Sequence, residues 1–134
     1  MMMDLTSPYA FGKTVAVSCA EAQLKVREAL AKEGFGVLTE IDISKKFAEK
    51  LQKEFRDYII LGACNPALAY EAMQNEINLG VLLPCNVVIY TRDDGKTAVM
   101  FMDPIARFSS IGNPELEAFG IKVTEKLEHV LDAI

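Results

Sequence analysis

The chain has 134 residues, of which 51% are hydrophobic and 25% charged, and it carries a net charge of −5. This length and composition predict one globular domain over residues 1–134, with residues 1–10 as a loose lead-in. The acidic balance, without any long run of Lys or Arg, excludes a surface that tracks nucleic-acid phosphates, so we expect no nucleic-acid partner.

The first predicted elements are a strand over residues 12–17 and a helix that runs to about Glu33. Ser18 and Glu21 form the pattern of a capping box at the start of this helix, and Gly34 is the expected stop. Four apolar residues at helical spacing predict its buried stripe: Ala22, Val26, Ala29 and Leu30.

A second strand is predicted over residues 36–41. Strand alternation places Val37, Thr39 and Ile41 on one face and Glu40 on the other. Two interpretations of Glu40 stay open. It either points to solvent at a sheet edge or faces a cleft that raises its pKa.

Ser44 is the expected N-cap of a second helix over residues 45–55. Apolar residues recur every four positions along it, which predicts a buried inner face formed by Phe47, Leu51 and Phe55. The lysines and glutamates between them predict a solvated outer face.

Residues 58–63 (YIILGA) are apolar on both faces and predict a strand in the centre of the sheet. Asn65 is then the expected cap of a third helix over residues 66–75, with Pro66 at its first position, where the missing N–H costs nothing. We expect this helix to bury Leu68, Ala72 and Met73.

A hairpin and a loop follow the third helix. After a short apolar segment at residues 81–83, strands over residues 86–91 and 96–103 are joined by the turn Asp93-Asp94-Gly95. Met100 and Met102 share one face of this hairpin and are interpreted as core filling. Residues 105–112 are predicted to form a loop.

Asn113 and Pro114 start the last predicted helix, which runs to about Asp132. Gly120 lies inside this helix and would allow a close packing contact there. The apolar stripe of the helix is Leu116, Phe119, Val123, Leu127, Val130 and Leu131.

Sequence features also predict the compartment. The apolar runs are too short to span a bilayer, and the first residues, MMMDLTSPYAFGK, lack the apolar centre of a signal peptide. Three cysteines, an odd number without close spacing, favour a reducing environment over a disulfide scaffold. We therefore expect a cytoplasmic protein with no membrane contact.

Four blocks of the sequence resemble domain of unknown function family 302 (DUF302), a family of small uncharacterised bacterial and archaeal proteins. The blocks are FGVLTEID (35–42), YIILGACNP (58–66), LLPCNVV (82–88) and Asp103-Pro104. The resemblance covers nearly the whole chain, and its ACNP and LPCN motifs are specific.

The resemblance implies an α+β domain with a TATA-binding-protein-like arrangement. In that arrangement a twisted, mostly antiparallel sheet has helices packed on one side. The resemblance implies neither DNA binding nor any established activity. The helix predicted within residues 65–75 is an addition to the plainest βαββββα order of elements.

A Cys-Asn pair stands at one end of each of two predicted strands: Cys64-Asn65 ends the first, and Cys85-Asn86 begins the second. The helix that starts after Cys64 would stabilise a thiolate through its free N–H groups and dipole, so we expect the pKa of Cys64 to fall. Asp103, also at a strand end, is the preferred carboxylate. The predicted ligand-binding residues are Cys64, Asn65, Cys85, Asn86, Asp103 and Glu40.

These residues favour a pocket that binds a small ligand or a soft metal ion. Two alternatives stay open. In the first, the protein is a thiol redox enzyme or sensor in which Cys64 attacks and Cys85 resolves. In the second, it is a non-catalytic oligomerisation domain whose cysteines only pack.

The spacing of 20 residues between Cys64 and Cys85 matches no zinc or thioredoxin template, and neither a metal site nor a cofactor is assigned. Whether the protein is an enzyme stays open. The high apolar content and an open sheet edge predict a homodimer.

Overall fold

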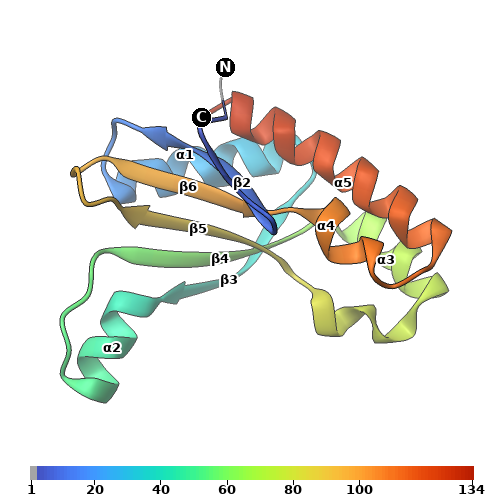
Figure 1. Ribbon diagram of the computed structural model, residues 1–134, viewed down its shortest axis with the longest axis horizontal. Helices are drawn as coiled ribbons and strands as arrows, with labels where there is room; N and C mark the ends of the chain where they lie inside the picture. Colours follow the sequence, from blue (N-terminus) through green and yellow to red (C-terminus); the bar gives the residue numbers. More distant parts are fainter. Residues whose placement is uncertain (1–2) are drawn as a thin grey trace.

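Six antiparallel strands form one open sheet in the order β1-β2-β6-β5-β4-β3. The structure is a computed structural model and describes residues 3–134. The strands are β1 (Leu5–Ser7), β2 (Ala10–Val15), β3 (Gly36–Asp42), β4 (Tyr58–Cys64), β5 (Cys85–Thr91) and β6 (Thr97–Met102). Figure 1 shows the sheet with its long strands side by side and with β3 at one edge.

The helices complete an α+β fold and pack mainly on one side of this sheet (Figure 1). They are α1 (Cys19–Lys32), α2 (Ile43–Leu51), α3 (Pro66–Asn75), the 3-10 helix η1 (Ile77–Leu82), α4 (Pro104–Ser109) and α5 (Pro114–Asp132). In the described residues 3–134, no helix combines the length and the apolar character that crossing a membrane requires.

The core lies between this side of the sheet and the helices. Alternate residues of β4, β5 and β6 point into it, because successive side chains of a strand face opposite sides. They include Leu61, Val87, Ile89, Val99 and Phe101, each at most 1% exposed. The helices supply the other half, including Val26, Leu30, Phe108, Val123 and Leu127.

The helix starts predicted from local capping signals are confirmed. Ser18 caps α1, Asn65 caps α3 and Asn113 caps α5, each accepting a hydrogen bond from a backbone N–H in the first turn. The predicted stripes of α1 and α5 are buried, whereas Ala72 is the buried residue of α3. Gly120 does allow close packing, since a Cβ there would lie 3.1 Å from the carbonyl oxygen of Pro104.

Two predicted segments differ from the structure. Residues 5–7 and residue 10 of the expected lead-in belong to β1 and β2, because β1 pairs with β2 as an edge strand; residues 1–2 lie outside the described residues. The expected loop 105–112 contains α4, which Asp103 caps. In the short apolar segment 81–83, Val81 and Leu82 end η1, and Leu83 is the residue that follows it.

The prediction that Val37, Thr39 and Ile41 share one face of β3 is also wrong. Val37 pairs with Ala63, but a β-bulge then shifts the register so that Thr39 pairs with Gly62 and Ile41 with Ile60. Because a bulge adds one residue to one strand, the side chains beyond it change faces. Thr39 and Ile41 therefore lie opposite the helix side, away from Val37.

The second helix begins and ends earlier than predicted. Asp42, not Ser44, caps α2 through the N–H of Lys45, and Gln52 ends the helix in the left-handed conformation. Phe55 therefore lies in the loop that follows. None of the residues of α2 is buried, so the expected inner face is not covered by the rest of the described chain.

The side of the sheet away from the core is here called the open face. Its side chains alternate with the core residues on β4, β5 and β6 and are largely apolar. They include Tyr58, Ile60, Val88, Tyr90, Met100 and Met102, all partly exposed. An antiparallel sheet whose second face meets water usually alternates apolar with polar residues, so the apolar character of this face requires an explanation.

Candidate functional site

A cavity of about 540 Å³ lies on the open face, between the middle of the sheet, the β1–β2 turn and α4. Residues from β5 and β6 form its floor: Asn86, Val88, Met100 and Met102. Tyr9 and Arg107 border it from the turn and from α4. This volume falls within the range of about 300–1,000 Å³ typical of small-molecule sites.

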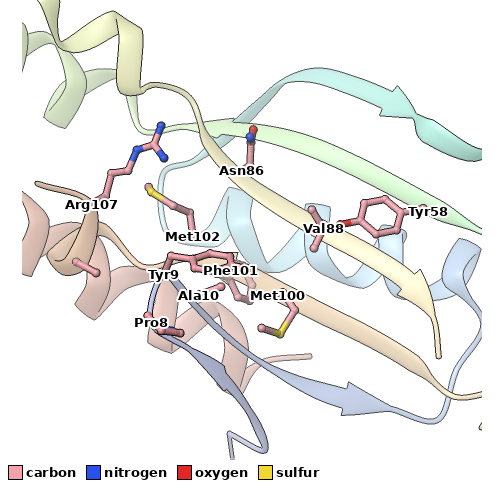
Figure 2. Close-up of a pocket in the computed structure, with 11 residues that line it drawn as sticks. Pro8, Tyr9, Ala10, Tyr58, Asn86, Val88, Met100, Phe101, Met102 and Arg107 are labelled. Atoms are coloured by element: carbon pink, nitrogen blue, oxygen red, sulfur yellow. The ribbon is translucent and has the colours of Figure 1, made fainter. Parts of the chain in front are cut away.

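The cavity has a charged end and a less polar end, where the hydroxyl of Tyr58 points toward Val88 (Figure 2). In Figure 2, Arg107 and Asn86 lie toward one end and Tyr58 toward the other, with methionine and valine side chains between them. The floor of Val88 and Met100 provides a surface for hydrocarbon, while the guanidinium and amide provide hydrogen-bond donors. A molecule with an apolar body and an anionic end fits this division.

The strand order brings residues that are far apart in the sequence into one cavity. Val88 and Met100 pair directly across β5 and β6, and Met102 pairs with Ala10 on β2. The backbone N–H of Asp103 donates to the carbonyl oxygen of Tyr9 at 2.9 Å, which holds the β1–β2 turn beside the start of α4. This contact places Tyr9 and Arg107 on the same rim.

Arg107 differs from the other arginines in its charge environment. Arg27 pairs with Glu40, Arg56 with Asp93 and Arg92 with Asp94. Arg107 is the one arginine that has no carboxylate within 4.0 Å among residues 3–134. A guanidinium at a cavity rim without an internal partner is well suited to a carboxylate or phosphate ligand.

The two predicted cysteines lie on neighbouring strands but outside this cavity. Cys85 pairs opposite Ala63, so Cys64 is the next residue along the partner strand. Cys85 is 5% exposed and belongs to the core, and Cys64 is half-buried at the end of β4. All three cysteines of the chain are free thiols.

Both of these thiols favour the protonated form. Burial raises the pKa of Cys64, so the expectation that the following helix lowers it is wrong. Burial, together with the nearby Cys64, raises the pKa of Cys85 to about 12, although the charge of Arg107 acts in the opposite direction. Desolvation disfavours the thiolate at both sites, because burial removes the Cys85 sulfur from water almost completely and the Cys64 sulfur in part.

Asn65 and Asp103 have structural roles at helix starts. Asn65 accepts from the N–H of Leu68 and donates its amide to the carbonyl oxygen of Glu33, which ties α3 to the end of α1. Asp103 accepts from the N–H groups of Ile105 and Ala106. Neither side chain lines the cavity.

Glu40 lies on the edge strand β3, on the helix side of the sheet. Its carboxylate accepts hydrogen bonds from Arg27 and Gln23 of α1, and its side chain is 48% exposed. Of the six predicted site residues, the structure therefore brings Asn86 alone into the cavity. The others lie at the ends of β4 and β5, at helix caps or at the sheet edge.

The donor set of a metal site is also absent from the described part of the chain. Within residues 3–134, no three His, Cys, Asp or Glu side chains lie together so that they could hold a metal ion. Met100 and Met102, interpreted above as core filling, are partly exposed and line the cavity. Their spacing of two residues shows that they share one face of β6. The sequence does not show whether the helices cover that face or leave it open.

Comparison with known proteins finds a matching family model and a similar solved structure. A family model with the description "Domain of unknown function DUF302" matches residues 11–134. Among solved structures, the chain is similar to an uncharacterized conserved protein DUF302 from Bacillus stearothermophilus, with 26% sequence identity and a TM-score of 0.88. The match covers 95% of this chain and 98% of that one. No curated protein matches the chain.

Proposed function

Because this chain belongs to the DUF302 family, whose description names no activity, we propose a function from the geometry of its own cavity. The protein binds a small organic anion with an apolar body in the cavity on the open face. The anionic group meets Arg107 and Asn86, and the body lies on Val88 and Met100. This proposal keeps the small ligand expected from the sequence but moves its site away from the cysteines.

The observation that carries the proposal is the guanidinium of Arg107 at the rim of an apolar cavity. Hydrogen bonds to charged groups contribute about 1.5–3 kcal/mol each, roughly twice as much as neutral ones. An arginine paired internally, such as Arg27 with Glu40, would have to break that pair to bind a ligand. Arg107 has no carboxylate partner to break among the described residues.

The same geometry favours ligand binding over the two thiol-based functions. A redox pair needs an accessible thiolate, but Cys85 is buried and its pKa is raised to about 12. A soft-metal site needs several thiolates or imidazoles converging on one point. The residues that line the cavity contain neither a cysteine nor a histidine.

Calorimetric titration with matched ligands tests the proposal. The probes are octanoate and 1-octanol, which share the alkyl chain and differ in the anionic group. We expect the unchanged protein to bind octanoate more tightly than 1-octanol. We expect Arg107→Gln to weaken octanoate binding by about tenfold or more and to leave octanol binding nearly unchanged.

Arg27→Gln is the matched control, because it removes a guanidinium that lies outside the cavity. It should bind octanoate as the unchanged protein does. Equal octanoate affinities for Arg107→Gln and Arg27→Gln would contradict the proposed role of Arg107. The absence of any binding of either probe by the unchanged protein would contradict the proposed function itself.

A further inference from the structure

The hydroxyl of Tyr58 lies at the end of the cavity opposite Arg107. Tyr58 belongs to β4 and lines the cavity, and Figure 2 shows its hydroxyl oxygen pointing toward Val88, along the apolar floor. The cavity thus carries a second polar group, at the far end from the guanidinium.

Ring packing fixes the position of this hydroxyl. Tyr58 pairs with Tyr90 across β4 and β5, and their rings stack with centroids 5.3 Å apart and planes inclined by 8°. The ring of Phe55 also packs on Tyr58, at a centroid distance of 6.1 Å. A tyrosine has only two side-chain torsion angles, so a ring held by two neighbours presents its hydroxyl at a defined point.

The Tyr58 hydroxyl is available to a ligand. Among residues 3–134, no side chain or backbone group forms a hydrogen bond with it. A phenolic hydroxyl both donates and accepts hydrogen bonds, and it usually has a partner when it is removed from water. Burial, with smaller contributions from Tyr90 and Tyr9, raises the pKa of Tyr58, so the group keeps its proton and can donate a hydrogen bond.

The two ends of the cavity differ in charge. Among the described residues that line it, Arg107 is the one charged side chain. A carboxylate at the Tyr58 end would leave water without a cation to pair with, and an unpaired charge in an apolar site is costly. An uncharged carbonyl, ether or hydroxyl oxygen needs only the hydrogen bond that the phenol donates. The far end of the cavity therefore suits an uncharged hydrogen-bond acceptor.

The strands set the separation of the two polar ends. Asn86 and Tyr90 are four residues apart on the same face of β5, which corresponds to about 13 Å along the strand. Tyr58 stands opposite Tyr90, and its hydroxyl reaches back toward Val88, which lies between them and Asn86. A ligand body that lies on Val88 can thus meet the guanidinium at one end and the phenol at the other.

We propose that Tyr58 determines the specificity of the cavity for organic anions that carry a second, uncharged oxygen on the apolar body. The phenol donates a hydrogen bond to that oxygen, while the anionic group binds Arg107. Oxo acids, in which a carbonyl group interrupts the alkyl chain of a carboxylate, have this chemistry. The inference rests on the proposed function and names the class of ligand that the same site selects.

Calorimetric titration of the full chain with octanoate and with its 5-oxo, 6-oxo and 7-oxo derivatives tests this inference. These probes share their charge and chain length and differ only in whether, and where, a carbonyl replaces a methylene. We expect the unchanged protein to bind at least one oxo acid about fivefold more tightly than octanoate, which is the effect of one net hydrogen bond. Tyr58→Phe keeps the ring that stacks on Tyr90 and removes the hydroxyl, so this preference should be lost. A general change of packing would alter both affinities together and leave their ratio unchanged.

Tyr90→Phe is the matched control, because Tyr90 stacks on Tyr58 but does not line the cavity. It should keep the preference for the oxo acid. Octanoate binding that depends on Arg107, without a preference for any oxo acid or with a preference that survives in Tyr58→Phe, would overturn this inference and leave the proposed function standing. The absence of octanoate binding would overturn both. Tighter binding of octanedioate than of every oxo acid would overturn the uncharged acceptor in favour of a second anionic group.

Discussion

Single residues decide which chemistry this chain can offer, and Cys85 shows this most clearly. Its thiol lies in the core beside β4, where ionisation would place a charge in a region without water. The neighbouring Cys64 adds to this effect, because a second thiolate nearby would repel the first. Cys85 is therefore a packing residue at the end of β5.

The raised pKa of Cys85 predicts a change of stability with pH. Its folded value of about 12 lies above its ordinary value of 9.0, so the protonated thiol stabilises the folded state fully below pH 9.0. That contribution is lost as the pH rises from 9.0 toward 12. We expect the free energy of unfolding to fall more steeply over this range than in Cys85→Ala, as measured by denaturant titration.

Lysine and tyrosine ionisation affects both proteins alike, so the comparison isolates the Cys85 thiol. Reaction with a thiol reagent provides a second reading. At a pH near 9.0, the ordinary pKa of a cysteine, Cys85 should stay unmodified in the folded protein and react once the chain is unfolded. Parallel stability curves, or rapid labelling of folded Cys85, would show that the thiol is not desolvated.

At the scale of elements, α4 connects the sheet to the candidate site. It is a six-residue helix that carries Arg107 to the cavity rim, and its start depends on Asp103. Asp103 accepts from two backbone N–H groups that would otherwise lack a partner. Its position at a strand end is thus explained by capping.

Two substitutions separate capping from ligand contact. Asp103→Ala should lower the free energy of unfolding by about 1 kcal/mol and weaken octanoate binding, because the first turn that positions Arg107 loses its cap. Asp103→Asn should leave both quantities close to those of the unchanged protein, since Asn caps as well as Asp does. If Asp103→Asn behaves like Asp103→Ala, the negative charge itself is required and the capping role is insufficient. Denaturant unfolding and calorimetry measure the two effects.

Local signals made some elements predictable from the sequence. The starts of α3 and α5 were predicted because Asn-Pro capping depends on adjacent residues alone. Asp103-Pro104 carries a similar signal, but the short α4 that it starts was interpreted as a loop. The bulge in β3 could not be predicted, because it exists only through pairing with β4.

At the scale of the whole molecule, the strand order determines the site. Asn86 was predicted as a site residue, but Tyr9, Met100 and Arg107 reach the cavity only because β6 lies between β2 and β5. Sequence alone did not show which face of this sheet the helices cover. The inner face of α2 was likewise expected to be buried in its own chain, but no residue of α2 is buried.

The central claim is that the open-face cavity, and not the cysteine pair, is the binding site. The most direct measurement is methyl NMR of protein labelled at its methionines, titrated with octanoate at fixed protein concentration. Met100 and Met102 line the cavity, while Met73 packs against the core and does not line the cavity, so it serves as the internal reference. We predict saturable shifts of the Met100 and Met102 signals, unchanged Met73, and loss of the shifts in Arg107→Gln. Saturable binding that leaves Met100 and Met102 unmoved, or that Cys64→Ser abolishes, would contradict the account.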